Sequence, residues 1–417
     1  MPAPTFAPFA RPLYVMAKPS GSLCNLRCSY CYYLEKERLY ADEQPTERYA
    51  MNDNTLEMFI RQYIEAQTQP QILFTWHGGE PLLRSISFYR RVIQLQQKYA
   101  RGHVIDNCLQ TNGTLITDEW ARFFAANHWL IGISIDGPQP LHDAYRLSQG
   151  GQPSFHRVMR GIRLLQKYHV EWNAMGVVNH LNAEHALDVY NFYKENGCQY
   201  IQFAPIVERL KLQCDGRHLA TPADGIGEGT LASYSITPQQ YAQFCCTIFD
   251  EWVRNDVAQV FVQLFDATLA RWVGEEPGVC TMCQSCGHAA AIEHNGDLYS
   301  CDHFVFPQYK LGNIHQQTIT QMMYSPQQQQ FGRSKRTSLP RQCLSCQWLS
   351  ICNGGCPKNR FCLSSDGEPG LNYLCEAFQT FFTHVAPYMD FMANELRHQR
   401  PPANVMQQAN AIEVRQK

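Results

Sequence analysis

The stretch that decides the fold is CNLRCSYCYY, residues 24–33, in which Cys24, Cys28 and Cys31 have the spacing C-x3-C-x2-C. It follows a short apolar run, residues 13–17, that predicts a β-strand. Three thiolates on one tight loop can bind three irons of a [4Fe–4S] cluster, which leaves the fourth iron open for a substrate or cofactor. The alternative is a zinc site that borrows a distant histidine, because structural zinc takes a fourth protein ligand.

Composition narrows the class of protein further. The chain has 417 residues, 35 Lys and Arg against 37 Asp and Glu, and 18 cysteines. The near-neutral charge argues against nucleic acid as a partner, because phosphate binding needs a basic field. No apolar run is long enough to span a membrane, and the N-terminus lacks the apolar core of a secretory signal. We therefore expect a cytoplasmic protein with no membrane partner, in which clustered thiols bind metal or take part in catalysis.

Short apolar runs alternate with segments of helical period from about residue 13 to residue 207. Six alternating strands and helices imply a parallel sheet, either doubly wound or a partial barrel. Asp118 stands where the N-cap of the third helix belongs. The predicted strands are 13–17, 72–76, 105–109, 131–135, 173–178 and 200–203, and the predicted helices are 55–66, 87–99, 118–127, 155–168 and 183–195.

Polar or glycine-rich motifs follow four of these strands. In parallel α/β folds the carboxyl ends of the strands gather the reactive groups, so we expect all four motifs to face one cavity. The motifs are Cys24–Cys31, Gly78-Gly79-Glu80, Thr111-Asn112-Gly113 and Asp136-Gly137.

The C-terminal half has a different composition. Residues 208–237 indicate a long irregular connection, residues 238–254 a helix, and the polar stretch from Pro401 onward a mobile tail. Ten cysteines lie between Cys280 and Cys375, with many turn residues, which indicates a small domain stabilised by metal. Eight of them fit two fully ligated cubane clusters, or two four-cysteine zinc sites. The eight are Cys280, Cys286, Cys301, Cys343, Cys346, Cys352, Cys356 and Cys375.

The N-terminal motifs resemble those of the radical S-adenosylmethionine (SAM) superfamily. The triplet after a first strand, with Tyr30 before its last cysteine, is similar to the superfamily's cluster motif, and Gly78-Gly79-Glu80-Pro81 is similar to its glycine-rich motif. The resemblance implies a partial (β/α)6 TIM-type barrel. It also implies that the SAM site is lined by Tyr30, Gly79, Ser134, Arg146 and Val207.

The C-terminal cysteines resemble the SPASM extension of radical SAM enzymes, which binds two auxiliary clusters. The resemblance implies one cluster on Cys280, Cys286, Cys301 and Cys356, and the other on Cys343, Cys346, Cys352 and Cys375. Cys283 and Cys362 are surplus, and Cys283 could compete as a ligand. The cofactors implied are SAM and three [4Fe–4S] clusters. The domains implied are a radical SAM core (1–207), a connecting segment with a helix (208–274), a SPASM domain (275–380) and a C-terminal helix with a mobile tail (381–417).

The whole chain, from about residue 12 to residue 388, resembles anaerobic sulfatase-maturating enzymes. Among the matching pieces are FTWHGGEPL, GISIDGP and SCDHFVFPQYKLGNI. The resemblance implies oxidation of a Cys or Ser in an unfolded or nascent sulfatase to Cα-formylglycine, with an electron donor such as flavodoxin or ferredoxin. Asp302 matches the family's proposed general base, Tyr33 a tyrosine near the active site, and His77 a position near the peptide where many relatives have Gln.

Two other functions fit parts of the sequence. A SPASM enzyme that crosslinks or modifies a small ribosomal peptide would share the motifs, but such maturases often have a leader-binding domain before the barrel, and the first strand here begins by residue 13. An iron–sulfur electron carrier or a zinc-stabilised binding protein would leave Gly78-Gly79-Glu80, Ser134 and Arg146 unexplained.

Overall fold

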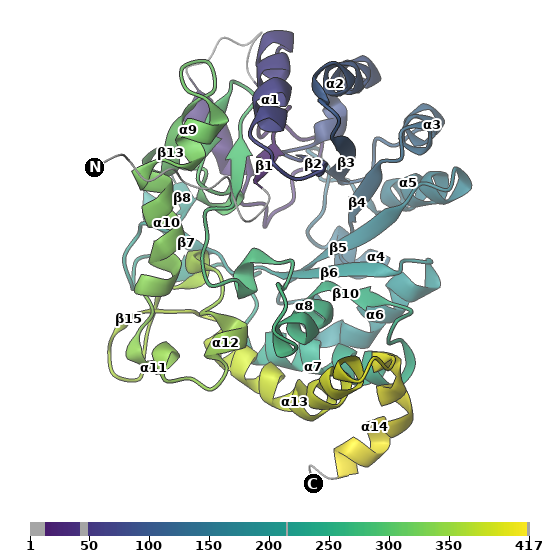
Figure 1. The fold of residues 1–417 in the computed structure, drawn as a ribbon, viewed down its shortest axis with the longest axis vertical. Coiled ribbons are helices and arrows are strands. Elements are labelled where there is room, and N and C mark those ends of the chain that lie inside the picture. Colours follow the sequence, from purple (N-terminus) through teal and green to yellow (C-terminus); the bar gives the residue numbers. More distant parts are fainter. Residues whose placement is uncertain (1–12, 42–48, 214–215, 415–417) are drawn as a thin grey trace. The chain divides into compact units, whose positions relative to one another are not determined.

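The computed structural model describes residues 13–41, 49–213 and 216–414. The first twelve residues of the predicted core domain and the last three of the predicted tail lie outside them. The chain forms two compact units, drawn in Figure 1. The first contains residues 1–133, 146–172 and 286–333, and the second contains residues 134–145, 173–285 and 334–417. A segment of the predicted C-terminal domain, Cys286–Arg333, is thus part of the first unit.

The first unit is built on a mostly parallel sheet. Its strands run in the order β4-β3-β2-β1-β11-β12-β13. β1 pairs in parallel with both β2 and β11, whereas β12 and β13 pair antiparallel. All four N-terminal strands lie within two residues of their predicted ends. The bounds are β1 Tyr14–Ala17, β2 Gln71–Trp76, β3 Val104–Thr111, β4 Leu130–Ser134, β11 Ala289–Ile292, β12 Asp297–Tyr299 and β13 Lys310–Asn313.

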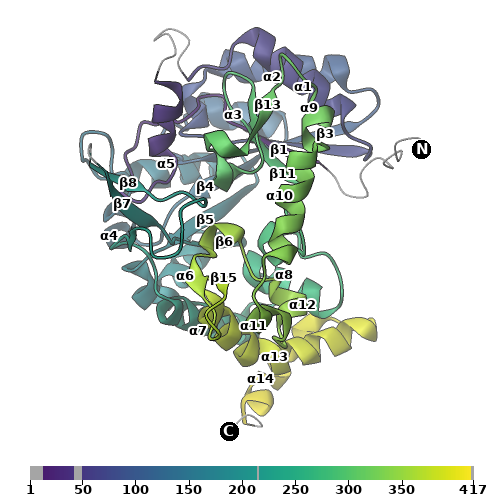
Figure 2. The ribbon, with the colours of Figure 1, turned by 90° about the vertical axis from the view of Figure 1, so that its left-hand side faces the viewer.

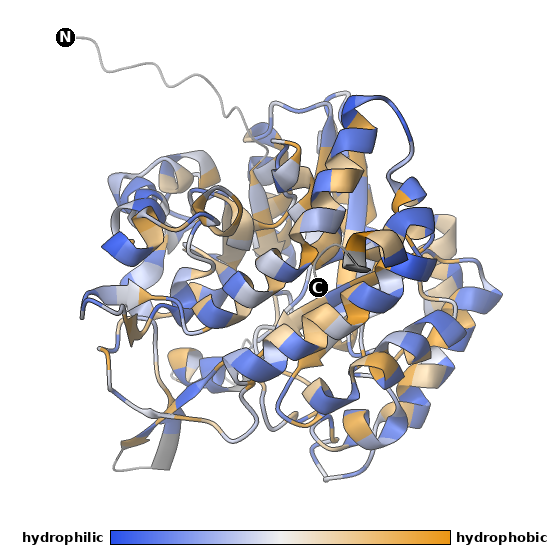
Figure 3. Ribbon diagram, turned by 90° about the horizontal axis from the view of Figure 1, so that it is seen from below, coloured by the Kyte–Doolittle hydropathy of each residue, from blue (hydrophilic) through white to orange (hydrophobic). Residues whose placement is uncertain are grey.

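Amphipathic helices cross between the parallel strands of this unit. Coloured by hydropathy, the helices show hydrophilic and hydrophobic sides (Figure 3). The prediction that Asp118 caps α3 is wrong by one residue, because the Thr117 side chain accepts the hydrogen bond from Trp120 N. The helices are α1 Asp53–Glu65, α2 Ile86–Tyr99, α3 Asp118–Ala126, α5 Phe155–Lys167, α9 Ile319–Met323 and the start of α10 Pro326–Thr337, with short 3-10 turns η1 Leu34–Tyr40, η2 Pro81–Leu83, η5 Asp302–Phe304 and η6 Pro307–Tyr309.

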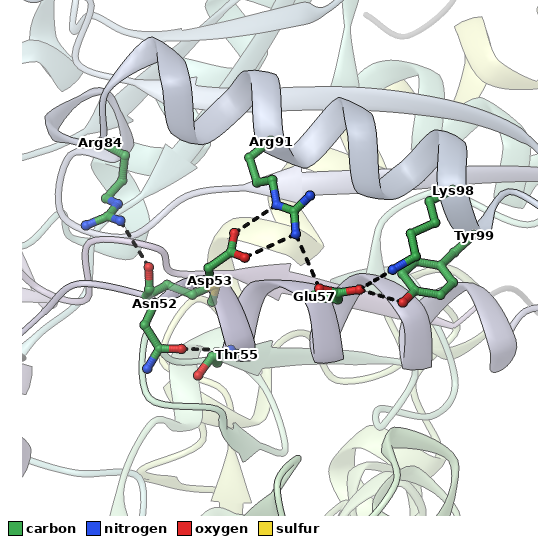
Figure 4. Close-up of polar contacts among 9 residues, drawn as sticks. Asn52, Asp53, Thr55, Glu57, Arg84, Arg91, Lys98 and Tyr99 are labelled. Atoms are coloured by element: carbon green, nitrogen blue, oxygen red, sulfur yellow. Dashed lines mark hydrogen bonds and ion pairs between the residues drawn. The ribbon is translucent and has the colours of Figure 1, made fainter.

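Helices α1 and α2 are joined on their exposed side by a charged network (Figure 4). Glu57 accepts hydrogen bonds from Lys98 Nζ and Tyr99 Oη, both at 2.6 Å, and from Arg91 at 3.3 Å. Arg91 also forms a two-bond pair with Asp53 at 2.9 and 3.1 Å. Because water screens exposed ion pairs, this network aligns the two helices without contributing much stability.

The second unit has its own strands and a helical layer. β5 Trp172–Val178, β6 Tyr200–Pro205 and β10 Phe261–Val262 pair in parallel in that order. Helices α7, α13 and α14 pack together, as Figures 1 and 2 show. Phe249 on α7 makes edge contacts with Phe381 and Tyr388 on α13. The helices are α4 Gln139–Asp143, α6 Ala186–Glu195, α7 Pro238–Asn255, α8 Gln263–Trp272, α11 Arg341–Leu344, α12 Leu349–Cys352, α13 Cys375–Arg397 and α14 Val405–Val414, with 3-10 turns η3 Asn182–His185, η4 Cys280–Met282, η7 Pro357–Asn359 and η8 Pro402–Asn404.

Two predictions for this unit are wrong. The segment expected to be irregular forms a three-stranded antiparallel sheet of β7 Arg209–Gln213, β8 Gly216–Leu219 and β9 Thr230–Leu231. The segment expected to be a mobile tail contains α14, which packs against α7 and α13. A two-stranded hairpin, β14 Cys362–Leu363 and β15 Pro369–Leu371, completes the unit.

Candidate active site

The cysteine loop begins directly after β1 in the first unit. Cys24, Cys28 and Cys31 are all partly exposed, and the chain turns tightly between them, with Cys31 N donating to Cys28 O at 3.0 Å. Burial raises the pKa of Cys24 to about 12, and the charges of Glu80, Cys28 and Cys31 add to this rise. These sulfurs therefore lie close enough to repel one another as thiolates. A bound cation would relieve that repulsion.

The donor set fits an iron–sulfur cluster. Over residues 13–41, 49–213 and 216–414, no three His, Cys, Asp or Glu side chains are grouped to hold one metal ion. A cubane cluster binds each thiolate on a different iron, so its ligands need not converge on one point. Three partly exposed sulfurs on one loop fit such a cluster, with one iron open.

Backbone contacts hold the cysteine loop against the Gly-Gly-Glu loop. Gly79 N donates to Gly21 O at 2.7 Å, and Glu80 N donates to Leu23 O at 2.8 Å. A Cβ atom on Gly79 would lie 2.6 Å from Ser22 O and 2.5 Å from the carbonyl carbon of Leu23. Only glycine therefore permits this approach of the two backbones.

The buried Glu80 carboxylate joins this loop to the loop after β3. Its Oε1 accepts from Thr111 Oγ1 at 2.7 Å and from Leu82 N at 2.9 Å, and its Oε2 accepts from Asn112 N at 2.9 Å. Asn112 Nδ2 then lies 3.7 Å from Cys24 Sγ. The motifs after the first three strands thus form one connected site, as the sequence predicts.

The fourth motif belongs to the second unit. The carboxylate of the fully buried Asp136 accepts from Val177 N at 2.9 Å. The side chain therefore anchors the start of its loop to β5.

Asp302 lies in a buried polar cluster of the first unit. Its Oδ2 accepts from Tyr32 Oη at 2.5 Å, and its Oδ1 forms an ion pair with the Lys18 ammonium. Burial raises the pKa of Asp302 and the nearby Lys18 charge lowers it, and the net result is a pKa below the ordinary value. Tyr32 directly follows Cys31, and Asp302 directly follows Cys301, so the Tyr32–Asp302 bond ties the two cysteine segments together.

The same ammonium contacts two further residues. Lys18 Nζ lies 3.1 Å from His77 Nδ1 and 4.4 Å from the centre of the Tyr33 ring. Tyr33 Oη donates to the buried Glu293 carboxylate. Burial, together with the Lys18 charge, lowers the pKa of His77 to about 3, so this imidazole is neutral at physiological pH. Sequence reasoning missed Lys18, Tyr32 and Glu293.

The residues predicted to line the SAM site are divided between the units. In the first unit the Arg146 guanidinium lies 5.5 Å from the centre of the Tyr30 ring, and both side chains are buried. Gly79 is part of the loop described above. Ser134, at the end of β4, and the buried Val207, after β6, belong to the second unit.

The second unit contains a complete set of four thiols. Cys343, Cys346, Cys352 and Cys375 line one small cavity with Trp348, Phe378 and Phe382. Burial and the mutual repulsion of these sulfurs raise the pKa of Cys375 to about 12, and burial raises that of Cys352 to about 11. The structure therefore brings together all four predicted ligands of this cluster.

The other predicted ligand set is divided. Cys280 and Cys356 belong to the second unit, whereas Cys286 and Cys301 belong to the first. Lys335 Nζ donates to Cys280 O at 2.6 Å. The surplus Cys283 thiol lies 3.4 Å from the Val279 carbonyl oxygen.

Comparisons with known proteins agree with this geometry. Residues 19–193 match the radical SAM superfamily, and residues 280–347 match an iron–sulfur cluster-binding domain, SPASM. The chain is 62% identical over 406 residues to a serine-type anaerobic sulfatase-maturating enzyme of Bacteroides thetaiotaomicron, covering 97% of each chain. It belongs to the family of anaerobic sulfatase-maturating enzymes.

More distant relatives include both types of this family. A cysteine-type enzyme of Clostridium perfringens is 31% identical, over 93% of this chain and 100% of its own. A solved structure of native anSMEcpe with bound AdoMet and the Cp18Cys peptide is 29% identical, with a TM-score of 0.80, and covers 93% of this chain and 100% of its own. These matches confirm the predicted fold class, a radical SAM α/β core with a SPASM extension, and show that the chain is a radical SAM enzyme. Within the described part of the chain, no helix is both long and apolar enough to cross a membrane.

Proposed function

We propose that this enzyme oxidises a serine in the active-site motif of an unfolded or nascent sulfatase to Cα-formylglycine. The proposal includes cysteine as a slower alternative target. The close similarity to a serine-type enzyme over 97% of the chain supports the choice of serine. The structural observation that carries the proposal is the Asp302 carboxylate, which Tyr32 joins at 2.5 Å to the cysteine loop.

The overall change removes a hydrogen atom, a proton and an electron from the target side chain. When bound, SAM and its cluster would together supply a 5′-deoxyadenosyl radical able to take one Cβ hydrogen atom, and the auxiliary clusters would supply acceptors for one electron. Asp302, whose side chain is 16% exposed, accepts the hydroxyl proton through its carboxylate.

The protein's other contribution is to hold the cofactors. The SAM-binding cluster would be held by Cys24, Cys28 and Cys31. The two auxiliary clusters would be held by the two predicted sets of four cysteines, which are Cys343, Cys346, Cys352 and Cys375, and Cys280, Cys286, Cys301 and Cys356. Arg146 would offer its guanidinium fork to the SAM carboxylate, and Ser134 its hydroxyl to the ribose. The backbone of Gly79 would approach the methionine amine, and Tyr30 and Val207 would line the adenosyl pocket. A reduced flavodoxin or ferredoxin would supply the electron that starts each turnover.

The test is an anaerobic assay with SAM, dithionite and matched peptides that carry Ser or Cys in the sulfatase motif. We expect about twelve irons per chain, as three cubane clusters require, and an aldehyde product by mass spectrometry. The serine peptide should react faster. If 5′-deoxyadenosine forms while both peptides stay intact, the enzyme modifies another class of peptide, and the proposal is wrong.

A further inference from the structure

Lys18, directly after β1, is a fully buried lysine in the first unit. A buried ammonium is costly unless charged or polar partners surround it. Lys18 has three such partners: the Asp302 carboxylate, His77 Nδ1 at 3.1 Å and the face of the Tyr33 ring at 4.4 Å. These partners come from three segments far apart in the sequence.

The chemistry of the ammonium fixes the direction of each contact. A lysine ammonium can only donate hydrogen bonds. His77 Nδ1 must therefore accept, so the hydrogen of the neutral ring is on Nε2. The Asp302 carboxylate is bound on both oxygens, by Lys18 at Oδ1 and by Tyr32 Oη at Oδ2. Two donors at different oxygens leave the carboxylate little freedom to rotate.

The partners of Lys18 link Asp302 to the loops that hold the cofactors. His77 directly precedes the Gly78-Gly79-Glu80 loop, and its ring also interacts with the Gly78 backbone. Tyr32 follows Cys31 in the cysteine loop. One buried ammonium thus connects the carboxylate, through His77, to the loop that packs on the cysteine loop.

We infer that Lys18 is a positioning residue that holds the Asp302 carboxylate and the His77 ring in one fixed arrangement beside the cysteine loop. The inference rests on the proposed function, in which Asp302 accepts the proton of the target residue. Hydrogen removal and proton removal act on the same side chain, so the carboxylate has to stay in place when the radical reacts. Without Lys18, SAM is still cleaved, but less of the resulting radical leads to aldehyde.

The experiment compares Lys18→Met with wild-type enzyme by the ratio of aldehyde to 5′-deoxyadenosine. A displacement of about 1 Å can cost about 100-fold in rate. We therefore expect kcat for aldehyde to fall about 100-fold and the ratio at least about tenfold. The KM for the serine peptide should change less than about threefold, because methionine fills most of the same volume as lysine and is only one atom shorter. Iron content should stay at the wild-type value.

Lys36→Met is the matched control. Lys36 is also buried in the first unit, but its ammonium lies over the Phe306 ring. We expect this variant to keep the wild-type ratio of products. Equal uncoupling in both lysine variants would overturn the inference, because loss of any buried lysine would then suffice.

A double-mutant cycle with Asp302→Asn tests whether Lys18 acts through Asp302. Lys18→Met alone leaves the partly buried Asp302 carboxylate without its ion pair. The double variant Lys18→Met/Asp302→Asn removes both charges and so guards against a variant that fails to fold. In the Asp302→Asn background, Lys18→Met should lower neither the aldehyde yield nor the thermal unfolding midpoint further. Additive effects on both measurements would overturn the inference.

Failure of the inference and failure of the proposed function give different results. If wild-type enzyme forms aldehyde and Lys18→Met keeps the wild-type ratio, the inference is wrong and the proposed function stands. If wild-type enzyme forms 5′-deoxyadenosine but no aldehyde, the proposed function fails, and the positioning role fails with it.

Discussion

Replacement of Gly79 by alanine tests the contact between the Gly-Gly-Glu loop and the cysteine loop. The new Cβ would lie 2.5 Å from the Leu23 carbonyl carbon and 2.6 Å from Ser22 O. Carbon atoms in contact are about 3.5–4.0 Å apart, so one backbone has to move by about 1 Å. Leu23 directly precedes Cys24, so this movement displaces the first cluster ligand.

The magnitude follows from two contributions. Overpacking of a tight contact costs about 1–3 kcal/mol. The hydrogen bonds from Gly79 N and Glu80 N, at 2.7 and 2.8 Å, are both strained by the movement. Each contributes about 0.5–1.5 kcal/mol, which gives a total of about 2–6 kcal/mol. For a cooperative unit of about 150–250 residues, this lowers the midpoint of thermal unfolding by at least about 4 °C.

The assay measures iron content, thermal unfolding and 5′-deoxyadenosine formation under anaerobic conditions. Gly79→Ala should lose iron from the cysteine loop and release little 5′-deoxyadenosine. Gly150→Ala is the control, because the nearest atom to its Cβ is Ser148 Oγ at 3.9 Å and its backbone is not left-handed. Wild-type iron content and SAM cleavage in Gly79→Ala would refute the argument from backbone approach.

Three further predictions concern polar groups that are fully or partly buried. Glu80→Gln places an amide N–H against a backbone or hydroxyl donor, so we expect a loss of about 1–3 kcal/mol and a lower unfolding midpoint. The control Glu57→Gln changes a carboxylate that is 30% exposed and should show little change, and an equal loss in both variants would contradict this reasoning. His77 has a pKa lowered to about 3, so its contribution is present above the unfolded value of about 6.5 and is lost as pH falls from there. Between pH 7 and about 5.5, wild-type enzyme should therefore lose about 1 kcal/mol more stability than His77→Gln, and parallel pH curves of the unfolding midpoint would exclude this. Arg360 donates to the Gly354 and Asn353 carbonyl oxygens at 3.0 and 2.9 Å, and so holds the turn that directly follows the predicted ligand Cys352. Arg360→Met should therefore release iron from the second unit to a chelator faster than wild-type enzyme, while SAM cleavage persists. Iron release and electron paramagnetic resonance can measure this.

The strands and the strand-end motifs could be predicted because their signals are local. Buried parallel strands are short apolar runs, and the turns after them need glycine or small polar residues. Gly78, with a φ of 131°, and the cysteine spacing belong to this class. The residues that join the first three motifs, Glu80 and Asn112, are both within the predicted motifs. The sequence therefore predicts this part of the site well.

The sheet at residues 209–231 could not be predicted because its hydropathy does not follow its burial. In β7, Arg209 is buried, at 8% exposed, whereas Leu212 is 83% exposed. The Arg209 guanidinium donates to the Gly225 and Glu228 carbonyl oxygens and lies over the Phe361 ring. Sequence patterns predict a strand when apolar residues alternate with polar ones and the apolar side is buried. Here the arginine is buried and the leucine is exposed, so the pattern does not predict a strand. Contacts within the folded unit decide this element.

The polar cluster around Asp302 shows a second limit of sequence reasoning. Lys18 follows a strand, and an isolated lysine there predicts a solvated side chain. Its burial depends on two distant residues, His77, which is 59 positions from Lys18 in the sequence, and Asp302. Tyr32, the other donor to Asp302, is 270 positions from that carboxylate. None of these residues has a spacing that predicts the cluster, and Asp302 was identified by family resemblance alone. Groups that shape the backbone leave a local pattern in the sequence, whereas a buried charge is stable only beside partners that the fold brings together. The residues that control proton transfer therefore have to be identified from the structure, and Lys18 is the first of them to test.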